Sequence, residues 1–180
     1  AVAAQARIAL QAAADRALAV ASPDAAVTYL QQALTVTGEP GEVMRIQLAL
    51  ASAARRAGNW PVVSEAAGAA LAQAEATADP VAIARASATL GQFLFFDGRS
   101  ADAAAVMTRA LEGLGDADPR TDVELRGLLA RTQMFLNQPA QALEWCDSGL
   151  VAAARIDHVR AIADLILTRA WACSALGRWR

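Results

Sequence analysis

The chain has 180 residues, of which 56% are hydrophobic and 19% are charged, so it holds enough apolar material for a folded core. Its formal net charge of -2 offers no basic excess for phosphate contacts, which argues against direct binding of nucleic acid. No lysine occurs in the sequence. A Walker A loop, a Schiff-base lysine and a lysine general base are therefore excluded within these residues.

The composition favours helices, because alanine dominates the apolar share and aromatic residues make up only 5%. No uninterrupted apolar run approaches about 18 residues, so no membrane-spanning helix is expected. The N-terminal stretch carries Arg7, Asp15 and Arg16 in helical register, unlike a signal peptide. Cys146 and Cys173 lack the spacing of a metal site, and they are typical of buried thiols in a reducing cytoplasm.

The chain divides into units of about 40 residues, each predicted to form two antiparallel helices. In the first unit, residues 3–38, the first helix is predicted to end and the second to begin at Ser22 and Pro23. Serine can cap the second helix and proline can occupy its first position. The second unit, residues 41–78, turns between its helices at Gly58. Each of these units is predicted to be a complete helical hairpin.

The same pattern continues through the second half of the chain. The third unit, residues 80–115, turns at Gly98, and the fourth, residues 119–156, turns at Asn137. The fifth unit, residues 158–180, supplies only a first helix, which predicts an incomplete repeat and a fragment of a larger protein.

The turn residues define the period of the repeat. Gly58, Gly98, Asn137 and Gly177 are spaced 40, 39 and 40 residues apart. Asparagine is the next best residue after glycine for a left-handed helix end, so its presence at position 137 fits the pattern.

The third unit shows a recognisable signature of large and small residues. Its first helix contains the run Leu90-Gly91-Gln92-Phe93-Leu94, and its second places Ala103, Met107 and Ala110 on one face. These residues resemble the tetratricopeptide repeat (TPR). The resemblance implies an all-α, right-handed superhelix, a solenoid of four antiparallel helix pairs plus a ninth helix, in a single domain.

Aromatic residues after the turns agree with this resemblance only in part. Trp60 and Trp179 lie where the family prefers an aromatic side chain, whereas Ser100 and Pro139 depart from that preference. The tryptophans are expected to pack between adjacent helices.

The period of about 40 exceeds the usual 34 residues of the family. Longer repeats of this kind resemble those of the large ATP-binding LuxR-type bacterial transcription regulators, the maltose regulon activator among them. The segment over residues 12–34 is similar to the start of such a region. This resemblance implies a cytoplasmic protein-protein interaction module that acts in signal transduction and transcription regulation.

In TPR proteins the first helices line a concave groove, so the resemblance implies that their outward residues contact the partner. Arginine forks beside large aromatic rings are enriched at binding hot spots and suit an acidic, partly hydrophobic peptide or a neighbouring domain. The alternative is that the rings pack against neighbouring helices and the arginines are solvated. The candidate groove residues are Arg45, Arg55, Arg85, Gln92, Phe95, Phe96, Arg131, Met134, Phe135 and Trp171.

Two other functions remain open at this point. The groove could sense a small effector and signal to an ATPase module, or the exposed end faces of the stack could drive self-association.

An enzyme, a cofactor site and a metal site are not expected. His158 is the only histidine, and it stands beside Asp157 at a predicted helix start, where an exposed loop residue is expected. Any Ser/His/Asp triad would have to use this one histidine. Asp116 and Asp118 lie in a connector, where they are expected to solubilise the loop and cap the helix after Pro119.

Overall fold

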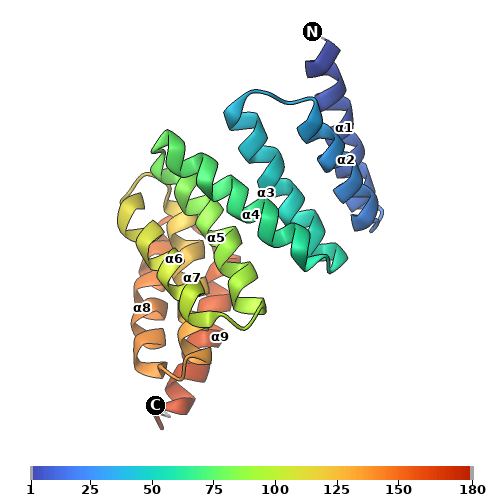
Figure 1. The fold of residues 1–180 in the computed structure, drawn as a ribbon. Coiled ribbons are helices and arrows are strands. Elements are labelled where there is room, and N and C mark those ends of the chain that lie inside the picture. Colours follow the sequence, from blue (N-terminus) through green and yellow to red (C-terminus); the bar gives the residue numbers. More distant parts are fainter. Residues whose placement is uncertain (1, 179–180) are drawn as a thin grey trace. The chain divides into compact units, whose positions relative to one another are not determined.

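The structure is a computed structural model that describes residues 2–178, and these residues form nine α-helices without a β-strand (Figure 1). The helices group into two compact units, residues 1–79 and residues 80–180. The predicted all-α fold of antiparallel helix pairs is confirmed for the described part of the chain. That the two units form a single superhelical domain stays a prediction.

Unit 1 contains four helices, each of which packs on the next in chain order. They are α1 (Val2–Ala19), α2 (Pro23–Thr35), α3 (Pro40–Ala57) and α4 (Trp60–Thr77).

Unit 2 contains five helices in two layers. The first helices of its hairpins pack side by side, α5 on α7 and α7 on α9, while α6 and α8 cover the other side of this layer (Figure 1). The helices are α5 (Pro80–Phe96), α6 (Ser100–Leu114), α7 (Pro119–Phe135), α8 (Pro139–Arg155) and α9 (Val159–Ala175).

The helix starts follow the local sequence. Pro23 is the first residue of α2, as predicted, because the missing N–H of proline is not needed in a first turn. Ser22 occupies the cap position, but its side chain accepts no capping hydrogen bond, so the expectation that it caps α2 is wrong. Asn59 does cap α4, since its Oδ1 accepts a hydrogen bond from the N–H of Val62.

The turns inside the hairpins confirm the period of the sequence. Gly58, Gly98, Asn137 and Gly177 all have positive φ angles, of 71°, 79°, 56° and 67°. Glycine enters this left-handed region without steric cost, and asparagine tolerates it better than most residues. The same left-handed backbone conformation therefore occurs at all four positions, and at Gly58, Gly98 and Asn137 it lies where the chain turns from the first helix of a hairpin to the second.

Small residues allow the hairpin helices to approach closely. A Cβ atom on Gly91 of α5 would lie 2.6 Å from Cγ of Met107 on α6, closer than real contacts allow. Ala103 and Ala110 are buried on either side of Met107. The large and small pattern that resembles the TPR signature is thus the pattern that packs this hairpin.

Candidate functional site

Four aromatic side chains form a continuous row across the first helices of unit 2. We call Phe95, Phe96, Phe135 and Trp171 the aromatic row. Phe95 contacts Phe96 with ring centroids 5.4 Å apart, and it contacts Phe135 at 4.7 Å. Phe135 contacts Trp171 at 5.7 Å, and all three pairs are edge-to-face. The row therefore joins α5, α7 and α9.

The repeat positions these rings near the helix ends. Phe95 and Phe135 are one period apart, in the last turns of α5 and α7. Trp171 lies one turn before the end of α9, and its larger ring still reaches Phe135. The structure brings Phe95, Phe135 and Trp171 together, and that they line a partner-binding groove stays a prediction.

Most of the aromatic row is open to solvent. The exposed fractions are 56% for Phe96, 61% for Phe135 and 46% for Trp171, whereas Phe95 is half-buried. Edge-to-face contacts stabilise such rings, but they leave much apolar area in water. Contiguous exposed apolar area of this kind is characteristic of binding surfaces.

One exposed arginine, Arg131, lies beside the aromatic row on α7. Arg131 precedes Phe135 by four residues on α7, so the two side chains share a face of this helix. Its side chain is exposed and forms no ion pair or hydrogen bond within the described residues. Gln92 precedes Phe96 by four residues on α5 and is half-buried.

Two of the predicted groove arginines are engaged inside the protein. In unit 2, Nε and Nη2 of Arg85 donate to Oδ2 of Asp118 at 3.1 and 2.7 Å. In unit 1, Nη2 of Arg45 donates to Glu42 at 2.5 Å and to Gln11 at 3.1 Å. Both side chains therefore link helices of their own unit.

Met134 does not belong to the exposed surface, contrary to the prediction. Its side chain is buried in a cluster with Ala142 and Ala172. Consecutive residues of a helix point about 100° apart, so the exposure of Phe135 goes with the burial of Met134. Arg55 is exposed on α3 of unit 1, and the site described here is confined to unit 2.

Asp118 organises the start of α7, and the sequence revealed only half of its role. Its Oδ1 accepts hydrogen bonds from the N–H groups of Arg120 and Thr121, which confirms the predicted cap. Its Oδ2 accepts from the Thr121 hydroxyl and from Arg85, a partner 33 residues away that no local pattern indicates. Burial favours the neutral acid, but the hydrogen bonds from Arg85 and Thr121 prevail and lower the pKa of Asp118.

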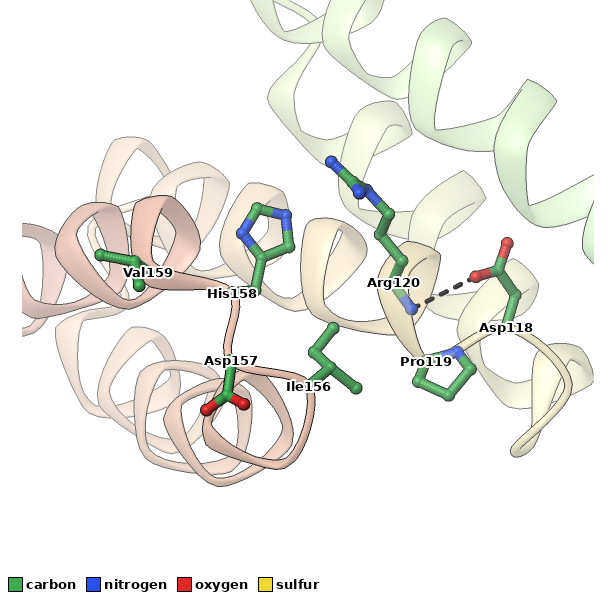
Figure 2. Close-up of a pocket in the computed structure, with 7 residues that line it drawn as sticks. All are labelled: Asp118, Pro119, Arg120, Ile156, Asp157, His158 and Val159. Atoms are coloured by element: carbon green, nitrogen blue, oxygen red, sulfur yellow. Dashed lines mark hydrogen bonds between the residues drawn. The ribbon is translucent and has the colours of Figure 1, made fainter.

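A hollow of about 430 Å³ lies where the chain enters α7 and α9 (Figure 2). It is open to solvent, and two of its polar side chains, Asp118 and His158, cap the helices α7 and α9. Nδ1 of His158 accepts a hydrogen bond from the N–H of Ala161 at 3.3 Å, so this histidine caps α9. Among the residues that the structure describes, no three His, Cys, Asp or Glu side chains are grouped to hold a metal ion. The residues that line the hollow are Asp118, Pro119, Arg120, Ile156, Asp157, His158 and Val159.

The two cysteines differ in their surroundings, which predicts different reactivity. Cys146 is fully buried on α8, and burial, assisted by the negative charge of Asp147, raises the pKa of Cys146 to about 11. Cys173 on α9 is half-buried. Because only the thiolate reacts, we expect iodoacetamide to alkylate Cys146 at least about 100-fold more slowly than a free cysteine at neutral pH. Peptide mass spectrometry over time checks this.

The control is the same reaction in concentrated urea, where both cysteines should react at similar rates. Alkylation of Cys146 in the folded protein as fast as in urea would contradict its buried position.

Comparison with known proteins informs the fold. No helix in residues 2–178 is long and apolar enough to span a membrane. No family model matches the sequence, and no curated protein matches it.

Solved structures of helical repeats are similar to this chain. The apo form of RapI superposes with a TM-score of 0.82 at 14% identity, covering 89% of this chain and 60% of the RapI chain. Two structures of a putative kinesin light chain from Podosopora anserina with nearly identical TPR-like repeats, one of them a variant with a single substitution, give TM-scores of 0.78 and 0.79. Their identities are 16% and 17%, and they cover 95% of this chain and 87% and 86% of their own. The chain therefore has the fold of TPR-like helical repeats.

Proposed function

We propose that this protein is a protein-protein interaction module whose unit 2 binds a peptide or a neighbouring domain along the aromatic row. The observation that carries the proposal is the row itself, because exposed rings from three successive first helices contact one another in one continuous surface. Aromatic side chains bury a large area at a small loss of side-chain entropy, which makes them effective anchors.

The charge beside the row indicates the chemistry of the partner. Arg131 has no internal partner within the described residues, so its guanidinium is free to form a forked pair with a carboxylate. Nε and Nη2 of Arg85 already donate hydrogen bonds to Asp118, so this arginine is less available to a ligand carboxylate. The proposed ligand therefore presents apolar side chains to the rings and a carboxylate to Arg131, and in this proposal its backbone bonds to the amide of Gln92, one turn before Phe96.

The test uses short fluorescein-labelled synthetic peptides in which leucine or phenylalanine alternates with aspartate or glutamate. Peptides that bind the protein in fluorescence anisotropy should lose about tenfold or more in affinity to Phe135→Ala, because the central ring of the row is removed. The Arg131→Gln variant should weaken these acidic peptides but leave amide-containing analogues unchanged.

Val151→Ala is the matched control, since Val151 is a similarly exposed apolar side chain on α8 outside the row. If the peptides bind the unchanged protein and Phe135→Ala with equal affinity, the aromatic row is not part of the binding surface. Equal losses in Phe135→Ala and Val151→Ala would point to a non-specific effect.

The wider context of the module is also a proposal. The long repeat and the segment over residues 12–34 resemble LuxR-type bacterial transcription regulators, which supports a cytoplasmic, non-catalytic role in a signalling or transcription regulator. The partner would then be a peptide or another domain of the same regulator. Sequencing the reading frame around the segment checks this, because an ATPase or DNA-binding motif would support the context and an unrelated enzyme domain would oppose it.

A further inference from the structure

The rings of the aromatic row are spaced at about one turn of an α-helix. Their centroids lie 5.4 Å apart for Phe95 and Phe96, 4.7 Å for Phe95 and Phe135, and 5.7 Å for Phe135 and Trp171. The pitch of an α-helix is about 5.4 Å, so side chains three or four residues apart repeat at about this interval. Side chains on one face of an extended chain repeat at about 6.6–6.8 Å. The spacing of the rings therefore matches a helix face better than a strand.

The rings form a continuous apolar surface, because neighbouring members of the row contact edge to face. Extended peptides gain specificity by placing alternate side chains in separate pockets. A continuous surface of touching rings instead fits an unbroken apolar stripe, such as one face of an amphipathic helix.

The backbone of a bound ligand also needs hydrogen-bond partners. Phe95, Phe96 and Phe135 have no side-chain atoms that form conventional hydrogen bonds, so an extended backbone laid over them would leave buried N–H and C=O groups without partners. Extended ligands can avoid this loss by adding to a sheet edge, but residues 2–178 form no β-strand. An α-helix pairs its own backbone groups and can cover the rings without this loss.

The polar residues beside the row agree with a helical ligand. Arg131 is exposed one turn before Phe135, where it would meet an acidic residue on the flank of the ligand helix. Gln92 lies one turn before Phe96, at the α5 end of the row. A helix leaves backbone groups free only in its first and last turns, so the amide of Gln92 would bond to an end of the ligand helix.

We propose that the aromatic row binds an amphipathic α-helix of a partner protein, which lies across α5, α7 and α9. The bound helix presents large apolar side chains at positions i, i+4 and i+7 to the rings and an acidic side chain to Arg131. The proposal depends on the binding function proposed above for the row, and it adds the conformation and the side-chain pattern of the ligand.

The experiment compares two fluorescein-labelled peptides of about 15 residues by fluorescence anisotropy. Both contain the same numbers of leucine, glutamate and alanine residues, so they have the same charge and the same apolar content. The helical peptide carries leucine at i, i+4 and i+7, and the alternating peptide carries it at every second position. We expect the helical peptide to bind at least about tenfold more tightly.

A third peptide tests the conformation directly. It has proline in place of a central alanine of the helical peptide, which interrupts the helix without removing a leucine or a glutamate. We expect its affinity to fall about tenfold or more. Nuclear magnetic resonance of the isotope-labelled helical peptide should show helical Cα chemical shifts in the complex.

Two variants locate the binding on the protein. Phe135→Ala should weaken the helical peptide about tenfold or more, because the central ring of the row is lost. Val151→Ala removes a similarly exposed apolar side chain of α8 and should leave the affinity unchanged.

Failure of the helical ligand can be distinguished from failure of the binding function. If the alternating or the proline-containing peptide binds as tightly as the helical one, and Phe135→Ala weakens it, the row is a binding surface and the helical ligand is rejected. If no peptide binds up to about 1 mM protein, both proposals are rejected. Equal affinities of Phe135→Ala and Val151→Ala would also reject both.

Discussion

Replacing Leu165 with alanine is expected to lower the free energy of unfolding of unit 2 by about 2–5 kcal/mol. Leu165 on α9 is 1% exposed, and its Cδ atoms lie 3.0 and 3.1 Å from the position that a Cβ on Gly149 would occupy. The same side chain packs with Val123 and Cys146 in the core that joins α7, α8 and α9. Its removal leaves a cavity between three helices, and the lost contacts cannot be regained without moving a helix.

Urea denaturation followed by far-UV circular dichroism measures this effect. Leu167→Ala is the matched control, because Leu167 is the same residue type on the same helix and is 70% exposed. The control should change the free energy of unfolding by no more than about 0.5 kcal/mol. Equal effects of the two substitutions would show that α9 is not anchored through Leu165.

Asp118→Ala is the second substitution with a large expected effect, about 1–2 kcal/mol in the free energy of unfolding. The change removes the cap of α7 and also the hydrogen bonds that Asp118 accepts from Arg85 of α5. Asp118→Asn keeps the capping oxygen and loses the charge, so its effect should be smaller. Asp116→Ala is the control in the same loop and should have little effect, since Asp116 is exposed.

The charge of Asp118 also predicts a dependence on pH. Its pKa is lowered in the folded protein, so the unfolded chain takes up the proton first and the charged form favours folding. The stabilisation is complete above the ordinary pKa of an aspartate, about 4, and is lost as the pH falls through the lower folded value. The difference in unfolding free energy between the protein and Asp118→Asn should shrink below pH of about 4. A difference that stays constant from neutral pH to about pH 3 would contradict this assignment.

Short patterns of glycine, asparagine and proline predicted the helices and turns, because the local steric properties of each residue largely determine its effect on the backbone. Glycine or asparagine at a fixed period predicted the left-handed turns, and Gly58 and Asn137 adopt them. Proline predicted the start of a helix, and the small residue at Gly91 predicted a close approach of two helices; both features are present. Such features depend on backbone sterics within a few residues, so a single sequence is enough to reveal them.

The candidate site was only partly predictable, since its details depend on residues far apart in the chain. Helical spacing placed Phe95, Phe135 and Trp171 on one surface, and the rings do meet. It did not show that Met134, one residue before Phe135, turns into the core. Nor did it show that Arg85 would be held by Asp118, because that pairing arises only when α5 packs on α7. A role of these residues in binding stays a prediction.

The aromatic row has a mechanical consequence. Helical repeats bend easily because each hairpin contacts only its neighbours. Any bending of unit 2 that tilts α9 away from α7 must separate the rings of Phe135 and Trp171, so curvature and ring contact change together. A ligand that contacts all four rings would restrain the movement of α5, α7 and α9 relative to one another, so unit 2 would become stiffer when the ligand is bound.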